Sequence, residues 1–264
     1  MQVRPKKALG QHFLTDLGIA RRIAATLDDY RGLPVVEVGP GMGVLTQFLL
    51  DGGHDVTAVE IDSESVEYLD REFPQLKGKV IEDDFLRMNL ANLFPDSDFC
   101  VIGNYPYNIS SQIFFHILDY RDRVVACSGM LQREVAERLA APAGKKARGI
   151  LSVLLQAWYD VEYLFTVDEK VFNPPPKVKS GVVMLRRNKV TDLGCDEALF
   201  KTVVKTSFGQ RRKTLRNSLR GILPAGTSLP DETIASMRPE QLTVEQFIEL
   251  TRSISTLRRN QSTQ

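Results

Sequence analysis

Seven short apolar runs alternate with segments of helical periodicity before residue 188. The runs are "PVVEV" (34–38), "VTAVE" (56–60), "KVIE" (79–82), "FCVIG" (99–103), "VVACSGML" (124–131), "WYDVEYLF" (158–165) and "GVVMLR" (181–186). Most are β-branched and apolar at successive positions, which is typical of strands buried on both faces. Helical patterns occupy residues 44–52, 63–72, 110–119, 132–140 and 149–157. This alternation predicts an α/β fold with a mostly parallel, doubly wound sheet.

The last two runs are connected differently from the others. Residues 166–178 between them contain three consecutive prolines and no helix-length pattern. Proline removes a backbone donor and breaks helices, so this segment reads as a loop. We therefore expect the final two strands to form an antiparallel pair at one edge of the sheet.

Beyond residue 188 the pattern is helical only. Helices are predicted over 196–208, 213–223 and 243–257. The last of them opens with "TVEQ", a capping box in which Thr243 and Gln246 can satisfy exposed backbone N–H groups. We expect two domains, one over residues 1–188 that begins with a basic arm over 1–15, and a small helical one over 189–264.

The charge is small in total but unevenly distributed. The net charge of the 264 residues is +1, yet residues 199–230 contain no acid. The basic residues of that stretch are Lys201, Lys205, Arg211, Arg212, Lys213, Arg216 and Arg220. Basic segments often bind phosphate, although solvated surface side chains would give the same pattern.

Several functional classes are disfavoured by composition. The three cysteines are far apart and form no C-x-x-C motif, and the three histidines show no metal-ligand spacing. The N-terminus lacks the apolar core of a signal peptide, and no apolar run reaches transmembrane length. We therefore expect a cytoplasmic protein with reduced thiols, no metal and no membrane partner.

The first predicted strand leads into a glycine-rich turn. Gly39, Gly41 and Gly43 have the spacing G-x-G-x-G. Glycine permits positive φ and close approach of a ligand to the backbone. The dinucleotide fingerprint has its third glycine one position later, where this chain has Val44. Alone, the turn fits a structural role as well as a ligand site.

Acidic residues follow the next two strands. Glu60 can accept hydrogen bonds from ribose hydroxyls, and Asp84 can accept an exocyclic adenine amine. The adjacent Asp83 leaves the second assignment ambiguous. Because open parallel sheets bind ligands at the carboxyl ends of their strands, these features together predict a nucleoside pocket. A dinucleotide and S-adenosylmethionine both fit, and the missing third glycine favours S-adenosylmethionine.

The fourth strand ends in "GNYPYNIS". The Asn104 side-chain carbonyl and the backbone carbonyl of Pro106 can accept both hydrogens of an adenine amine, and Tyr107 offers a ring for stacking. Pro106 restricts its own backbone and that of Tyr105. An Asx turn before a capped helix would give the same letters. Downstream of a nucleoside pocket, the catalytic interpretation is favoured.

"NYPY" is similar to the N-[ILP]-P-[YFW] signature of adenine and cytosine N-methyltransferases, and nearly the whole chain resembles the KsgA family of rRNA adenine dimethyltransferases. The matching motifs are "KKALGQHFLTD", "VEVGPGMGVLT", "VIGNYPYNIS", "MLQREVAERL", "VFNPPPKVKSGVV" and "FGQRRKTLRNSL". The resemblance implies a Rossmann-like class I methyltransferase with a seven-stranded, mostly parallel sheet and a small all-α C-terminal domain. It also implies transfer of four methyl groups from S-adenosylmethionine to two adjacent adenines in the 3′-terminal hairpin loop of 16S rRNA in the small ribosomal subunit.

The resemblance also assigns site residues. The cofactor positions are His12, Leu14, Gly39, Gly41, Glu60, Asp84 and Asn104. The catalytic positions are Asn104, Pro106, Tyr107 and Phe172, the last facing Tyr107 across the target base. Arg211, Arg212, Lys213 and Arg216 are the RNA-binding positions, although the two arginines Arg211 and Arg212 could instead cap helices or bridge the domains. Tyr105 replaces the usual aliphatic residue, and the sequence assigns it no role.

Alternatives remain at this point. A dimethyltransferase of the antibiotic-resistance type, acting on large-subunit rRNA, would share the pocket and "N-x-P-Y". A ribosome-assembly factor that binds immature small subunits is an alternative of another class. A dinucleotide oxidoreductase is disfavoured by Val44 and by the lack of hydride-transfer residues. We expect the protein to act as a monomer.

Overall fold

The computed structural model describes Lys6 and residues 9–262. Most of the basic arm predicted over residues 1–15, including Arg4 and Lys7, therefore lies outside the described residues. The chain forms two compact units, Met1–Glu137 with Asp160–Arg187 and Arg138–Tyr159 with Asn188–Gln264. The division by contacts differs from the expected domains 1–188 and 189–264, because Arg138–Tyr159 is grouped with Asn188–Gln264.

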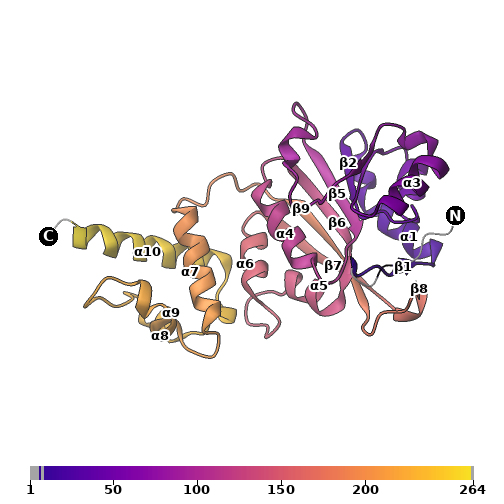
Figure 1. Ribbon diagram of the computed structural model, residues 1–264. Helices are drawn as coiled ribbons and strands as arrows, with labels where there is room; N and C mark the ends of the chain where they lie inside the picture. The colour runs from indigo at the N-terminus through magenta and orange to yellow at the C-terminus, as the bar shows by residue number, and fades with distance from the viewer. Residues whose placement is uncertain (1–5, 7–8, 263–264) are drawn as a thin grey trace. The chain divides into compact units, whose positions relative to one another are not determined.

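All seven predicted strands belong to one sheet in the order β4-β3-β2-β5-β6-β9-β7 (Figure 1). The strands are β2 (Pro34–Val38), β3 (Asp55–Glu60), β4 (Val80–Glu82), β5 (Phe99–Asn104), β6 (Val124–Gln132), β7 (Tyr159–Val167) and β9 (Ser180–Arg187). The pairs among β2 to β6 are parallel, whereas β9 runs antiparallel to β6. The expected mostly parallel sheet is confirmed.

The expected antiparallel pair at the sheet edge is also present. Strands β9 and β7 are neighbours at one edge. The N–H of Asn188, just after β9, donates to the carbonyl of Trp158, just before β7, at 2.9 Å. The end of one strand thus meets the start of the other, as antiparallel pairing requires.

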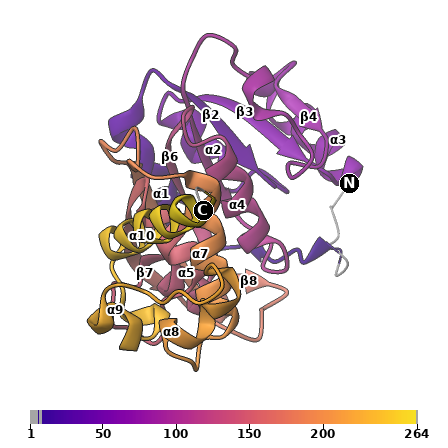
Figure 2. The same cartoon turned by 90° about the vertical axis from the view of Figure 1, so that its left-hand side faces the viewer.

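Helices cover both faces of the sheet, and all but the last three residues of α5 belong to the first unit. They are α1 (Leu17–Ala24), α2 (Thr46–Asp51), α3 (Ser63–Glu72), α4 (Ser110–Asp119) and α5 (Arg133–Ala140). Apolar residues of α1, α2 and α3 share one core cluster with alternate residues of the strands. Figure 1 shows α4 and α5 across the other face, and both views show α3 beside β3 and β4 (Figures 1 and 2). Burial on both faces explains the unbroken apolar runs.

Two very short strands were not predicted from the sequence. Strand β1 (Phe13–Leu14) pairs antiparallel with β8 (Phe172–Asn173), with Leu14 opposite Phe172. Two residues cannot display a strand periodicity, so no sequence pattern announces them. The pairing fastens the N-terminal segment to the proline-rich loop.

The second unit is helical. Its helices are α6 (Ile150–Gln156), α7 (Glu197–Gly209), α8 (Leu215–Ser218), α9 (Glu232–Ser236) and α10 (Val244–Ser262). Its short 3-10 helices are η6 (Arg220–Ile222) and η7 (Pro239–Gln241), whereas η2 (Ala25–Tyr30), η3 (Pro74–Leu76), η4 (Leu90–Asn92) and η5 (Glu169–Val171) belong to the first unit. Helices α7 and α10 lie side by side (Figures 1 and 2). The described residues after Asn188 form no strand.

Local signals explain where these helices begin. The predicted capping box is present, because the Thr243 N–H donates to Gln246 Oε1 at 2.9 Å and the Gln246 N–H donates to Thr243 Oγ1 at 3.2 Å.

The single helix predicted over 213–223 is wrong, since the chain forms α8 and then η6. Helix α9 was not predicted, because five residues are too few to show helical periodicity.

A buried arginine holds Arg138–Tyr159 against the C-terminal part of the second unit. Arg148 is 1% exposed. Its guanidinium donates to the carbonyls of Leu242 (3.2 Å) and Ala141 (2.7 Å), and to Gln156 Oε1 (2.6 Å). Burying a guanidinium is costly unless its donors are hydrogen-bonded, and these acceptors take three of its five N–H groups.

We predict that Arg148→Met lowers the free energy of unfolding by about 2–4 kcal/mol, because the apolar stem is kept while buried carbonyls lose their donors. Denaturant titration followed by circular dichroism measures this. Lys145→Met, at an exposed position nearby, is the control and is expected to change the stability little. Equal effects of the two variants would contradict the assigned role of Arg148.

Candidate active site

One cavity opens at the carboxyl ends of β2, β3, β4 and β5, and all of its lining residues belong to the first unit. All seven predicted cofactor residues line it, namely His12, Leu14, Gly39, Gly41, Glu60, Asp84 and Asn104. Pro106 and Tyr107 also line it. Residues from four strand ends and from the N-terminal segment thus meet at one place, as the parallel sheet predicts.

The glycine-rich turn and Glu60 are in direct contact. Gly41 has a φ of 56°, and its N–H donates to Glu60 Oε2 at 3.0 Å. Glu60 Oε1 accepts the N–H groups of Ile61 (2.9 Å) and Asp62 (3.0 Å). Burial raises the pKa of the Glu60 carboxyl, while these three N–H groups counteract the shift. The carboxylate is therefore fixed in orientation at the cavity wall.

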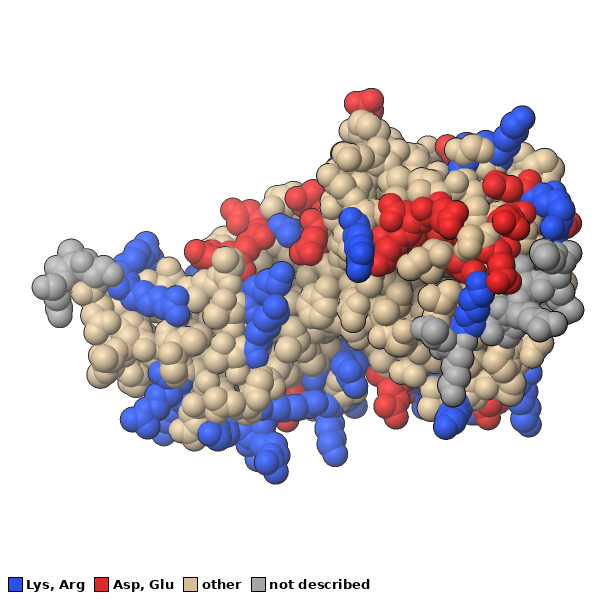
Figure 3. Space-filling view, in the orientation of Figure 1, with Lys and Arg blue, Asp and Glu red and all other residues tan. Residues whose placement is uncertain are grey.

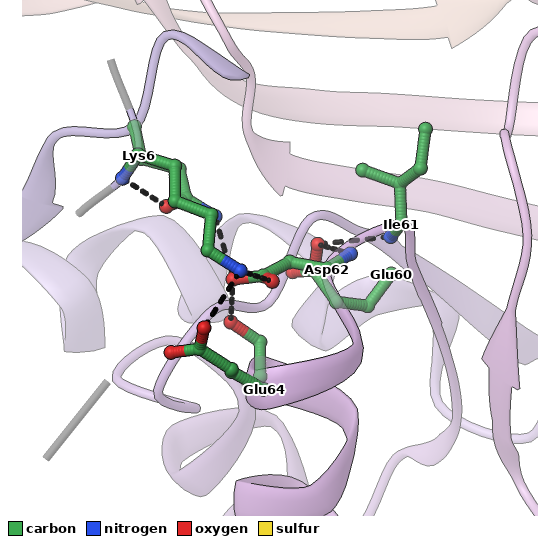
Figure 4. Close-up of polar contacts among 7 residues, drawn as sticks. Lys6, Glu60, Ile61, Asp62 and Glu64 are labelled. Atoms are coloured by element: carbon green, nitrogen blue, oxygen red, sulfur yellow. Dashed lines mark hydrogen bonds and ion pairs between the residues drawn. The ribbon is translucent and has the colours of Figure 1, made fainter. Parts of the chain in front are cut away.

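A second carboxylate beside Glu60 fastens the N-terminal segment. Figure 4 shows Lys6 reaching Asp62 and Glu64 at the start of α3. The ammonium of Lys6 lies 3.0 Å from Glu64 Oε1 and forms a closer ion pair with Asp62. Burial alone would raise the pKa of Asp62, but hydrogen bonds from Lys6, Gln11 and Ser65 bring it below its usual value. Asp62 is thus ionised and holds the segment that forms one side of the cavity.

Asn104 is oriented by the backbone of His12. Its side-chain Nδ2 donates to the His12 carbonyl at 3.1 Å. The amide nitrogen therefore points to the N-terminal segment, which leaves Oδ1 as the acceptor. His12 also lies against Tyr107, with ring centroids 5.5 Å apart at 27°. The Tyr107 hydroxyl contacts the hydroxyl of buried Ser180, which fixes the ring at the cavity wall.

Tyr105 has a positional role that sequence analysis missed. It is 1% exposed, and its hydroxyl donates to the Ser128 carbonyl at 2.7 Å. Its ring fills the space over Gly103 and Gly129, where an added Cβ would lie within 3.1 Å and 2.6 Å of ring carbons. Since Tyr105 stands between Asn104 and Pro106, its anchorage to β6 fixes both predicted acceptors relative to the sheet. In the sequence, the glycines at positions 103 and 129 are the feature from which this role of Tyr105 could have been predicted.

Phe172 is the predicted catalytic residue that the structure does not bring to the cavity. It is 4% exposed, pairs with Leu14 across β1 and β8, and belongs to the apolar core cluster. The ring is therefore a core residue in this structure, and its position does not support the expected role opposite Tyr107. The ring that does lie against Tyr107 is that of His12.

Other cavity residues were not singled out by the sequence. Ile61 lines the cavity beside Glu60 and is 53% exposed, and the buried Phe85 follows Asp84. An apolar side chain left exposed at a cavity wall offers a surface for a flat ligand ring. Both Asp83 and Asp84 line the cavity; Asp84 is the less exposed, and its Oδ1 accepts the Leu86 N–H at 3.0 Å.

The four predicted RNA-binding residues lie in the second unit, where Lys and Arg side chains gather (Figure 3). Arg211 contacts the Lys146 carbonyl and lies 3.8 Å from Glu240 Oε2, and Arg216 pairs with Glu232. Arg212 and Lys213 are exposed and have no ion-pair partner among the described residues. The described His, Cys, Asp and Glu side chains form no group of three or more that could hold a metal ion.

Solved structures define the class of the fold. The chain is similar to a dimethyladenosine transferase from Plasmodium falciparum, with a TM-score of 0.77 and 23% identity over 93% of this chain and 98% of that one. It is also similar to the 23S rRNA methyltransferase ErmE, with a TM-score of 0.66 and 28% identity over 92% of this chain and 99% of that one. The predicted class I methyltransferase fold is confirmed.

Sequence relatives define the family. A family model described as ribosomal RNA adenine dimethylase matches residues 3–256. A protein of Parabacteroides distasonis called ribosomal RNA small subunit methyltransferase A is 68% identical over 251 residues, covering 94% of this chain and 93% of that protein. One of the same name from Porphyromonas gingivalis is 66% identical over 252 residues, covering 95% and 98%. The chain belongs to the ribosomal RNA adenine dimethylase family, as its motifs predicted.

We predict that Tyr105→Phe lowers the free energy of unfolding by about 1–2 kcal/mol, because the buried Ser128 carbonyl loses its donor. Tyr163→Phe is the matched control, since that hydroxyl contacts Thr166 near the surface. Chemical denaturation of both variants measures the difference. A Tyr105→Phe protein as stable as the parent would contradict the anchoring hydrogen bond.

Proposed function

We propose that this protein transfers methyl groups from S-adenosylmethionine to the N6 amines of two adjacent adenines in the 3′-terminal hairpin loop of 16S rRNA, giving N6,N6-dimethyladenines during small-subunit biogenesis. The observation that carries the proposal is the orientation of Asn104, whose Nδ2 is bound by the His12 carbonyl so that Oδ1 remains as acceptor. Relatives named small subunit methyltransferase A support the choice of RNA.

The cavity fits S-adenosylmethionine. Glu60, fixed by three N–H groups, can accept the ribose hydroxyls, and Asp84 can accept the adenine amine, with Ile61 and Phe85 against the ring. His12, Leu14 and the turn at Gly39 and Gly41 enclose the remainder. When bound, the cofactor supplies an electrophilic methyl group on a sulfonium. No metal takes part in this proposal.

The target adenine would stack on Tyr107 and present its amine to Asn104. The amine is a weak nucleophile because its lone pair is delocalised into the ring. Asn104 Oδ1 and the Pro106 carbonyl accept its two hydrogens, which favours a pyramidal nitrogen aimed at the methyl group. Stacking contributes about 1–3 kcal/mol per base, which helps offset the cost of extracting the base. A hairpin loop presents bases that are already partly unstacked.

The second unit would supply RNA affinity. Arg212 and Lys213 are exposed and unpaired among the described residues, so they can neutralise phosphates without breaking an ion pair. Arg211 and Arg216 already have carboxylate partners, so binding phosphate would cost them those contacts. We place the protein in the cytoplasm, with the assembling small subunit as its partner, and as a monomer. No described helix is long and apolar enough to cross a membrane.

A second candidate substrate is large-subunit rRNA. The likeness to the 23S rRNA methyltransferase ErmE, at 28% identity, favours it. The relatives at 66% and 68% identity carry the small-subunit name and outweigh it.

The deciding experiment incubates the protein with labelled S-adenosylmethionine and, separately, unmethylated small and large ribosomal subunits. We expect label on two adjacent adenines of the small subunit alone. Label on the large subunit would establish the second candidate instead, and no label on either RNA would refute methyl transfer to rRNA.

We predict that Asn104→Ala reduces the rate of methyl transfer by about 100-fold or more, since removal of one fixed hydrogen-bonding group at a reacting centre commonly has this effect. Folding should persist, because Asn104 is not a core residue. Single-turnover kinetics on the small subunit measure the rate. Asn108→Ala, in the same turn but exposed and outside the cavity wall, is the control and should retain most activity.

We predict that Arg212→Gln with Lys213→Gln weakens binding to the small-subunit hairpin and lowers the salt slope of the affinity by about 1 for each phosphate that is no longer neutralised. Filter binding across a salt series measures both. The charge-matched control is Arg71→Gln with Lys77→Gln, exposed on the first unit. An unchanged slope in the first variant would locate the phosphate-binding surface elsewhere.

A further inference from the structure

One buried carboxyl in the cavity wall has no part in the reaction described above. Glu37, on β2, is 1% exposed and lines the cavity. Its Oε2 accepts the hydroxyl of buried Thr46 at 2.6 Å, and Oε1 has no hydrogen-bond partner among the described residues. A buried carboxyl is stable when it is neutral or when a cation is close, so its surroundings decide its charge.

Sheet order locates Glu37 relative to the reacting groups. Strand β2 lies between β3 and β5, and Glu37 is paired with Ala58 on one side and Ile102 on the other. Glu60 and Asn104 each stand two residues further along those neighbouring strands. If Glu60 holds the ribose and Asn104 the acceptor amine, the sulfur that connects ribose and methyl group lies over β2. Glu37 is the ionisable residue of that strand.

The groups around Glu37 favour its neutral form when no cation is present. Burial raises the pKa of Glu37 to about 8, the Thr46 hydroxyl lowers it, and the charge of Glu60 on β3 raises it. Its pairing partners Ala58 and Ile102 are apolar, as is Ile23 of α1, which also lines the cavity. A positive charge placed over β2 would favour the carboxylate and release the proton.

We propose that Glu37 is the counter-ion of the sulfonium, and that it releases its proton to solvent when the methyl donor binds and regains one when the uncharged thioether product remains. The inference rests on the proposed function. Methyl transfer removes the positive charge from sulfur, so the carboxylate loses its partner at that moment. Glu37 thereby raises the affinity of the cavity for the positively charged donor relative to its affinity for the uncharged product.

The sign of the pH effect follows from this linkage. Below about pH 8 the free carboxyl is mostly protonated, so donor binding must displace a proton. Donor affinity should therefore rise about tenfold per pH unit toward pH 8 and level off above it. S-adenosylhomocysteine shares the amino acid and adenosine parts but lacks the charge on sulfur, so its affinity should change much less.

The test is isothermal titration calorimetry of the full chain at pH 7 in two buffers of different ionisation enthalpy, with S-adenosylmethionine and with S-adenosylhomocysteine. We expect about one additional proton released per donor bound, relative to product. Glu37→Gln keeps the shape of the side chain and should abolish this difference, whereas Glu72→Gln, an exposed acid on α3, should preserve it.

Equal proton release for donor and product in the native protein would overturn the inference, and this comparison needs no variant to fold. If Glu37→Gln still released more protons on binding donor than on binding product, the proton would come from another group, and the inference would also be overturned. Binding of S-adenosylmethionine without proton release leaves the proposed function standing. Failure to bind S-adenosylmethionine at any pH would refute the proposed function and this inference together.

Discussion

The parallel pairing of β2 with β3 and with β5 is the constraint on which the site depends. Parallel strands deliver their carboxyl ends to one edge, so the turn at Gly39, the carboxylate of Glu60 and the amide of Asn104 meet there although about 65 residues of sequence separate the first from the last. The helices that cover both faces keep these strands dry and their hydrogen bonds intact. A shift of one strand by a single residue would turn its side chains to the opposite face and dismantle the cavity.

Around this edge, each functional group is held by a neighbour that does not itself react. Backbone N–H groups orient Glu60, the His12 carbonyl orients Asn104, and Ser180 contacts the Tyr107 hydroxyl. Tyr105, which stands between the two predicted acceptors in the chain, packs its ring over Gly103 of β5 and Gly129 of β6 and donates to the Ser128 carbonyl. Such support matters because a weakly nucleophilic amine reacts efficiently only if its hydrogen-bond acceptors are already in place. Reorganisation of these groups during the reaction would raise the activation barrier.

The two units differ in the charge of the ligand that their side chains suit. The cavity of the first unit contains acids, of which Glu37 and Glu60 are buried and have raised pKa values, an environment that favours a cationic ligand. The second unit presents Arg212 and Lys213, which are exposed and have no ion-pair partner among the described residues and so suit a polyanion. A nearly neutral total charge conceals these opposite preferences, so the net charge by itself says little about partners.

Sequence alone determined the seven strands of the large sheet, its mostly parallel order, the capping box at Thr243 and the cavity positions Gly39, Glu60, Asp84 and Asn104, because each depends on local periodicity or on residues at strand ends. His12 and Leu14 came from the family resemblance of the motif around them. Only the tertiary structure decided what depends on distant neighbours. Phe172 is a core residue because β8 pairs with β1, a pairing too short to leave a sequence pattern. Tyr105 found its role because Gly103 and Gly129 on adjacent strands leave room for its ring. From the sequence, Glu37 is only one polar residue within an apolar strand; the tertiary structure shows that it is buried and lines the cavity, on the strand between those of Glu60 and Asn104.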